Sequence, residues 1–310
     1  MPSLAIEMGA RDQPLLAQTI GDNLRQTVAR VPNNDAIVSL HQDLRWTYQD
    51  FYTRVQRLAS GLLAAGLKPL DRLGLWSPNY AEWILVQYAT AEIGVVLVNV
   101  NPAYRTHELA YALNQSGCRF LIAAPSYLTS NYQAMVASVQ DQTPVLERTV
   151  FFWSPEWEAL IAGDAQYQAS VEDLRGQLNP DDPINIQYTS GTTGFPKGAT
   201  LTHRNILNNG YFVGELQRLT EQDRMCIPVP FYHCFGMVMG NLACTSHGAT
   251  MVIPSDGFDA ARTLEAVSQE RCTALYGVPT MFIAELAFED FTKFDLSSLR
   301  TGVMAGAPCP

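Results

Sequence analysis

This sequence contains, between residues 188 and 198, the stretch Tyr188-Thr189-Ser190-Gly191-Thr192-Thr193-Gly194-Phe195-Pro196-Lys197-Gly198. Glycines let backbone N–H groups approach an anion closely, and the hydroxyl groups and Lys197 add further donors and a positive charge. The preceding apolar run, residues 184–188, has the composition of a β-strand. The stretch therefore predicts a phosphate-binding loop at the end of a strand.

Two widespread phosphate-binding motifs do not fit this loop. The P-loop requires a lysine directly after a glycine and a hydroxyl residue directly after that lysine. Here Lys197 lies between Pro196 and Gly198, and the dinucleotide pattern G-x-G-x-x-G is also absent. A hydroxyl-rich surface loop without a ligand remains an alternative, because such clusters are common in loops.

Strand and helix patterns alternate on both sides of the loop. A helix capped by Thr47 follows an irregular beginning, Gly117 is expected to end a later helix, and Thr202 is expected to cap another. Residues 153–183 are polar, proline-containing and expected to be irregular. This alternation indicates βαβ units and mainly parallel sheets covered on both faces. We therefore predict an α/β fold with two stacked, doubly wound subdomains, formed by residues 1–70 with 215–310 and by residues 71–214. The expected strands are 72–76, 95–98, 120–123, 149–152, 184–188, 225–229, 250–253, 273–276 and 301–305, and the expected helices after residue 70 include 80–93, 126–138, 237–244 and 260–270.

Four unusual segments follow predicted strands. They are the loop itself, residues 230–236, residues 277–280 and residues 306–308. Ligands of open α/β sheets bind beyond the carboxyl ends of the strands, so the four segments are expected to meet at one cleft.

Composition excludes several classes of function. The formal net charge of −10 and the isoelectric point near 4.9 disfavour nucleic acid and anionic membranes as partners. The six cysteines lack zinc-site spacing, and no apolar run reaches the roughly 20 residues that span a bilayer. We expect a soluble cytoplasmic protein without a metal site of its own, and the sequence leaves its oligomeric state open.

The loop closely resembles the signature of the adenylate-forming (AMP-binding) superfamily, and the resemblance extends from Trp46 to Pro310. Residues 98–105 look most like fatty acyl-CoA synthetases of the medium-chain branch. The resemblance implies ATP, a fatty acid and coenzyme A as substrates, with Mg2+ as a cofactor. A carboxylate would attack ATP to give acyl-AMP and pyrophosphate, and the thiol of coenzyme A would then displace AMP.

The same resemblance assigns roles to individual residues. It gives His233 a catalytic place at the acyl carboxylate, although a lone histidine is also compatible with a structural role. The implied phosphate-binding residues are Thr189, Ser190, Gly191, Thr192, Thr193, Gly194, Phe195, Pro196 and Lys197. The implied acyl pocket contains His233, Phe235, Gly236, Met237, Gly277, Val278 and Pro279, and the implied adenine side contains Gly306, Ala307 and Pro308.

The sequence departs from the family at its end. Members continue with a threonine for the α-phosphate, a glutamate for Mg2+, an aspartate for the ribose and a small C-terminal domain. None of these follows Pro310. The expectation is therefore a C-terminally truncated ligase that binds its substrates but turns them over poorly.

Three alternatives remain open. The chain could belong to an aryl-CoA ligase, to an amino-acid adenylation domain, or to a non-catalytic module that binds nucleotide or acyl groups. An amino-acid-activating enzyme usually places a carboxylate in the turn at residues 231–235. No acidic residue lies there, which favours an uncharged acyl tail.

Overall fold

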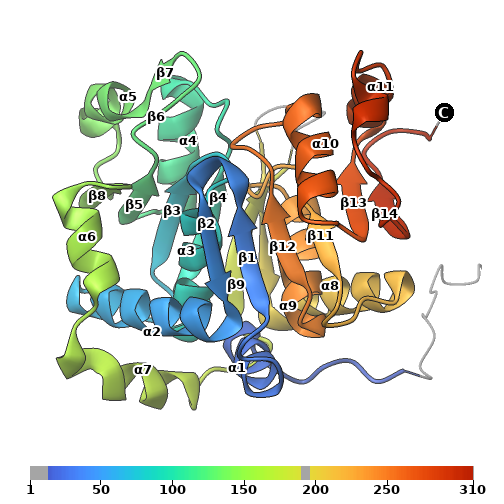
Figure 1. Cartoon of the computed structure of the whole chain (residues 1–310). Helices are drawn as coiled ribbons and strands as arrows, with labels where there is room; N and C mark the ends of the chain where they lie inside the picture. Colours follow the sequence, from blue (N-terminus) through green and yellow to red (C-terminus); the bar gives the residue numbers. More distant parts are fainter. Residues whose placement is uncertain (1–12, 190–195, 310) are drawn as a thin grey trace, which may run out of the picture.

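The structure of the protein is a computed structural model that describes residues 13–189 and 196–309. These residues form two six-stranded sheets, A and B, and one short hairpin (Figure 1). Sheet A has the order β14-β13-β11-β12-β1-β2, and sheet B the order β10-β9-β4-β3-β5-β8. The strands of sheet A are β1 (Asp35–Ser39), β2 (Leu44–Thr47), β11 (Arg224–Cys226), β12 (Thr250–Ile253), β13 (Ala274–Gly277) and β14 (Thr301–Met304). Those of sheet B are β3 (Arg72–Trp76), β4 (Val96–Val100), β5 (Phe120–Ala123), β8 (Arg148–Phe151), β9 (Pro183–Tyr188) and β10 (Gly198–Thr202), and the hairpin is β6 (Ser126–Tyr127) with β7 (Ser130–Asn131).

Helices cover the faces of both sheets. In the first half of the chain they are α1 (Ile20–Arg30), α2 (Tyr48–Ala64), α3 (Ala81–Glu92), α4 (Thr106–Ser116), α5 (Tyr132–Val139), α6 (Pro155–Ala162) and α7 (Gln168–Arg175). The second half contributes α8 (His203–Gln217), a π-helix (Phe235–Leu242), α9 (Ala243–His247), α10 (Ala260–Gln269) and α11 (Pro279–Leu286). Among the described residues, no helix is both long and apolar enough to cross a membrane.

Both sheets are parallel except at one edge. Strand β2 pairs antiparallel with β1 at the edge of sheet A, and β10 pairs antiparallel with β9 at the edge of sheet B. All other strand pairs of the two sheets run parallel within the described part of the chain. The carboxyl ends of neighbouring strands therefore share one side of each sheet, as the sequence predicted.

One apolar cluster includes side chains of both sheets, such as Leu97 of sheet B and Tyr276 of sheet A. A smaller cluster lies between sheet A and the helices α10 and α11, whose places on that sheet Figure 1 shows. Burial of this apolar surface supplies the main driving force for joining the sheets and helices. The shared cluster fixes the position of one sheet relative to the other.

Local signals set several helix ends. Thr47 and Asp50 form a capping box at the start of α2, and Thr202 and Asn205 form one at the start of α8. The glycine at position 117 adopts a left-handed conformation with φ +64° and ends α4. These ends lie where the sequence predicted them.

The predicted α/β class with two sheets is confirmed, and several local predictions are wrong. Residues 153–183 contain α6 and α7 instead of irregular chain. Helix α6 is only about two turns long and buries only Trp157 and Leu160, so its apolar pattern is too short to indicate a helix from the sequence. The irregular beginning contains α1, β1 and β2. The helix predicted at 237–244 is a π-helix from Phe235 followed by α9. The helix predicted at 126–138 begins only at Tyr132, because the residues before it pair as the hairpin β6–β7.

Strand β11 is shorter than predicted. It ends at Cys226 and not at residue 229, because Pro228 and Pro230 have no N–H to extend a ladder. Sheet A takes its strands from residues 35–47 and 224–304, and sheet B from residues 72–202. The subdomain boundaries proposed from the sequence stay a prediction.

Candidate functional site

The phosphate hairpin, which we define as residues 183–202, consists of β9, β10 and the loop between them. Its base is closed by the amide of Thr189, which donates to the carbonyl of Lys197 at 3.0 Å. The hydroxyl of Tyr111 donates to the carbonyl of Pro196 at 3.0 Å and ties the hairpin to α4. Lys197 is exposed, and the predicted ligands Ser190, Gly191, Thr192, Thr193, Gly194 and Phe195 lie outside the described residues.

The His233 turn, residues 228–236, follows β11 of sheet A. The backbone N–H of Phe235 donates to Nδ1 of His233 at 3.1 Å, so the neutral imidazole carries its proton on Nε2. His233 reaches solvent, but neighbouring groups exclude part of the water around its ring and lower its pKa. The arrangement presents a neutral ring with one N–H donor near pH 7.

Glycine is required at position 236 of this turn. A Cβ atom there would lie 2.5 Å from the carbonyl oxygen of Pro230 and 3.0 Å from the Cα of Phe231. Both atoms belong to the backbone and cannot move aside without opening the turn. Gly236 therefore allows the close chain crossing that holds His233 in place.

Apolar side chains follow His233 on the side of the π-helix. Phe235 and Met237 are buried, and the ring of Phe235 lies 5.3 Å from the ring of Tyr276 at the end of β13. Gly277 and Val278 come directly after Tyr276, and Pro279 is the first residue of α11. The structure thus brings the two predicted acyl-pocket segments together.

The predicted adenine-side turn follows β14. Gly306 has φ +89°, and a Cβ atom on it would lie 3.2 Å from Cγ1 of Val278. Ala307 and Pro308 are exposed. This turn therefore lies against the segment that follows β13, as expected for neighbouring parallel strands.

A buried asparagine connects the two sheets at this point. Nδ2 of Asn99, in β4, lies 3.0 Å from Oε1 of Gln187 in the phosphate hairpin and 2.9 Å from the carbonyl oxygen of Tyr232 in the His233 turn. Sequence reasoning missed Asn99. Its signal is a polar residue inside the otherwise apolar run Val96–Val100.

A second asparagine that the sequence analysis missed, Asn79, holds the His233 turn from the other side. Its Nδ2 donates to the carbonyl of Val229 at 2.9 Å, and its Oδ1 accepts from the N–H of Phe231 at 2.8 Å. Asn79 follows β3, so it also reaches across from sheet B. The turn that carries His233 is thus fixed by side chains of the other sheet.

A cavity of about 210 Å³ borders the His233 turn. Its wall includes Asn79, Asn101, Tyr127, Tyr232, Asp256 and Phe258. The cavity lies between the carboxyl ends of strands from both sheets, where ligands of such folds bind. Tyr232 belongs to the segment 230–236 that was expected at the cleft, whereas Asn79, Tyr127 and Asp256 were not predicted to lie there.

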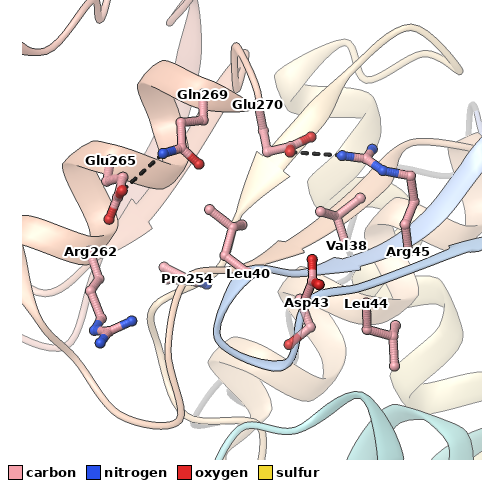
Figure 2. A pocket seen from close by; sticks show the side chains of 11 residues that line it. Val38, Leu40, Asp43, Leu44, Arg45, Pro254, Arg262, Glu265, Gln269 and Glu270 are labelled. Atoms are coloured by element: carbon pink, nitrogen blue, oxygen red, sulfur yellow. Dashed lines mark hydrogen bonds and ion pairs between the residues drawn. The ribbon is translucent and has the colours of Figure 1, made fainter.

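A polar groove of about 320 Å³ lies elsewhere, between the β1–β2 turn and α10 (Figure 2). Arg45 bridges Glu270, at 2.8 Å, and Asp35 at its rim. Gln269 donates to Glu265 at 2.9 Å along the same helix (Figure 2). None of the predicted site residues lines this groove within the described part of the chain.

His203 and His247 both bond to groups within the fold. Nδ1 of His203 accepts the N–H of Ile20 at 3.2 Å, and burial lowers its pKa to about 4. His247 contacts Glu215 at 3.0 Å. Over residues 13–189 and 196–309, no cluster of three or more His, Cys, Asp or Glu side chains could hold a metal ion.

Known proteins share this fold and much of this sequence. Medium-chain acyl-CoA ligase ACSF2, mitochondrial, of Danio rerio is 41% identical over 323 residues, which cover 97% of this chain and 53% of that protein. The inhibitor-bound N-terminal domain of FACL13 from Mycobacterium tuberculosis superposes with a TM-score of 0.83 at 25% identity, covering 94% of this chain and 71% of that domain. Anthranilate CoA ligase AuaEII, in complex with anthranoyl-AMP, gives a TM-score of 0.81 at 25% identity over 98% of this chain and 57% of its own.

The chain spans about half the length of the curated relatives it matches. The sequence pattern of AMP-binding enzymes nevertheless matches residues 24–310, which is most of the chain. With this match and the two-sheet fold, the protein belongs to the family of AMP-binding enzymes.

Proposed function

We propose that this chain provides the ATP- and acyl-binding part of an AMP-forming fatty acid–CoA ligase. In the first step a carboxylate oxygen attacks the α-phosphorus of ATP, and pyrophosphate leaves. In the second step the sulfur of coenzyme A attacks the acyl carbon, and AMP leaves. Both steps place growing negative charge on fixed oxygens, so the residues that position and stabilise those oxygens carry the catalysis.

The observation that carries this proposal is the position of Asn99. One side-chain nitrogen bonds to the phosphate hairpin at 3.0 Å and to the His233 turn at 2.9 Å. A nucleotide on the hairpin and a carboxylate at the turn would therefore lie in the same region. This is the arrangement that an attack of carboxylate on phosphorus requires.

Each predicted residue has a proposed task. The amides and hydroxyls of residues 189–196 and the ammonium of Lys197 would bind the β- and γ-phosphates. His233 would donate its Nε2 proton to a carboxylate or phosphoryl oxygen, because Nδ1 already accepts from Phe235. Phe235, Gly236, Met237, Gly277, Val278 and Pro279 would surround the acyl chain, and Gly306, Ala307 and Pro308 would lie against the adenine.

Mg2+ beside phosphates is usually held by the phosphates themselves with one or two carboxylates. Among the residues that the structure describes, no cluster of three or more ligating side chains is present. When bound with ATP, the ion would neutralise charge on the phosphates. The cavity beside Tyr232 would give substrate access to the turn.

A medium-chain fatty acid is our preferred acyl substrate. The ACSF2 relative is a medium-chain ligase by name, and residues 231–235 contain no charge that would select an amine. An aryl acid is the second candidate, because AuaEII, with the same fold, holds anthranoyl-AMP. The cytoplasmic location stays a prediction, and the ACSF2 relative is described as mitochondrial.

Isothermal titration calorimetry tests the proposal with octanoate, benzoate and phenylalanine as titrants, each in the presence of ATP. We expect octanoate to bind most tightly and Lys197→Ala to weaken ATP. Tighter binding of phenylalanine than of octanoate would contradict the assignment.

A further inference from the structure

We propose that Asn99 is a positioning residue that couples the phosphate hairpin to the His233 turn. Nucleotide bound at the hairpin and carboxylate bound at the turn would then strengthen each other's binding. The inference rests on the proposed function, because that function supplies the two ligands, nucleotide and carboxylate. Asn99 would link the two halves of the site without being a ligand of either.

The amide of Asn99 can adopt only one orientation. Nδ2 of Asn185 donates to the carbonyl of Leu97 and to Oδ1 of Asn99, both at 2.9 Å. Because Leu97 offers only an oxygen, the amide of Asn185 is fixed, and it fixes the oxygen of Asn99 in turn. The two hydrogens on Nδ2 of Asn99 must then face Gln187 and Tyr232.

The parallel pairing of β4 with β9 builds this row of amides. Leu97 lies opposite Asn185 and Asn99 opposite Gln187 in the register of the two strands. Alternate residues of a strand share a face, so Asn99, Asn185 and Gln187 lie on the same face of sheet B. Met237 closes the row, with its Sδ 3.3 Å from Nδ2 of Asn99.

Burial makes the contacts of this row costly to break. Asn99 and Asn185 are each 1% exposed, so water does not replace a lost partner. A shift of β9 that moves Gln187 must therefore move Asn99 or break a partly buried hydrogen bond whose Asn99 side water does not reach. The same holds for a shift of the turn at Tyr232, and the two segments are expected to respond together.

Asn99 contacts residues that lie close in sequence to each proposed binding residue. Gln187 is two residues before Thr189 in the hairpin, and Tyr232 directly precedes His233 in the turn. Asn99 is thus placed to act through these segments and not by touching a substrate. Two sites coupled in this way must influence each other equally in both directions.

The experiment measures octanoate binding by calorimetry with and without AMPCPP, the ATP analogue whose α,β-methylene bridge cannot be cleaved by attack on the α-phosphorus. In the wild-type chain we expect AMPCPP to tighten octanoate binding about fivefold or more, within the usual range for coupled sites. In Asn99→Ala and in Asn99→Asp, which keeps the shape but lacks the donor, the gain should fall below about twofold. Asn208→Ala is the matched control, because Asn208 is also buried and bonds to Leu16 away from the site; its coupling should equal that of the wild type.

The outcomes separate this inference from the function on which it rests. Coupling that survives in both Asn99 variants, or that is absent in a wild type that binds both ligands, overturns the inference and leaves the proposed function standing. A wild type that binds neither ligand overturns both. Amide hydrogen exchange of the wild type provides a measurement without any variant. AMPCPP should slow exchange in residues 231–237, and unchanged exchange there overturns the coupling.

Discussion

The side chain of Asn79 replaces a backbone partner for Phe231: the N–H of Phe231 donates to Oδ1 of Asn79 at 2.8 Å, across the boundary between the two sheets. The opposite end of the same amide donates to Val229. The chain between residues 229 and 231 contains a proline and leaves its sheet, so it has no strand to pair with. A side chain of sheet B thus completes the turn of sheet A that carries His233.

Replacing Asn79 by alanine is expected to destabilise the protein by about 2 kcal/mol or more, because it leaves an N–H and a carbonyl buried without partners. Urea unfolding followed by circular dichroism measures the loss. Asn114→Ala is the control, since Asn114 bonds to Gln142 at the surface and its loss should cost under about 1 kcal/mol. Equal stability losses in the two variants would contradict the bracing role of Asn79.

Adding one methyl group at Gly236 is expected to weaken octanoate binding sharply. The new Cβ would meet the Pro230 carbonyl at 2.5 Å and force the turn open, at a cost of about 1–3 kcal/mol in stability. Gly176→Ala is the matched control, because the nearest atom to its Cβ lies 3.5 Å away. Gly176→Ala should match the wild type both in octanoate affinity, measured by calorimetry, and in stability, measured by urea unfolding. Normal octanoate binding by Gly236→Ala would show that glycine is not required at position 236.

Acidification is expected to destabilise the fold through His203. Burial lowers its pKa from 6.5 to about 4, so the folded state rejects a proton that the unfolded chain accepts. The stabilisation is present above pH 6.5 and is lost as the pH falls through about 4, with a total of about 3 kcal/mol. Urea unfolding between pH 7.5 and 4.5 should show a smaller loss in His203→Gln, and an equal loss would contradict this assignment.

Glu285 is expected to act in the opposite direction. Its side chain, on α11, is buried, and burial raises its pKa from 4.5 to about 7. Below pH 4.5 the carboxyl is protonated in both the folded and the unfolded chain, so its burial costs no stability through ionisation. As the pH rises through about 7, the unfolded chain ionises this group more readily than the folded state does, and the folded state loses stability. Glu285→Gln should therefore stabilise the protein by about 2 kcal/mol at pH 8.5 and by little at pH 5. A variant that is less stable than the wild type at pH 8.5 would show that the carboxylate has a favourable partner.

The sequence predicted the parts of the fold that local chemistry determines. Thr47 and Thr202 begin helices through side-chain caps, and the apolar runs 72–76 and 120–123 form strands with those bounds. The strand predicted at 184–188 forms as β9, since its run of alternating residues is itself a local signal. The approach of Phe235 to Tyr276 followed from a general rule about parallel strands and not from these residues alone.

The rest depends on contacts between distant segments. Asn79 lies about 150 residues from its partners in the His233 turn, and nothing in its own neighbourhood indicates them. The π-helix forms where Gly236 and Gly240 let the chain approach Pro230 and Ile227, which a helical periodicity does not reveal. The row of amides does have a local signal, because Asn185 and Gln187 alternate with apolar residues in β9.

The most direct test of the account is the affinity of the chain for octanoyl sulfamoyl adenosine, a stable analogue of octanoyl-AMP. This molecule joins an acyl chain to an adenosine, so it must reach the Phe235 side and the Gly306 side of the site at once. We predict that calorimetry gives at least about 100-fold tighter binding than AMP or octanoate alone, and a marked loss with His233→Ala. Binding no tighter than that of AMP, or unaffected by His233→Ala, would contradict a shared nucleotide and acyl site.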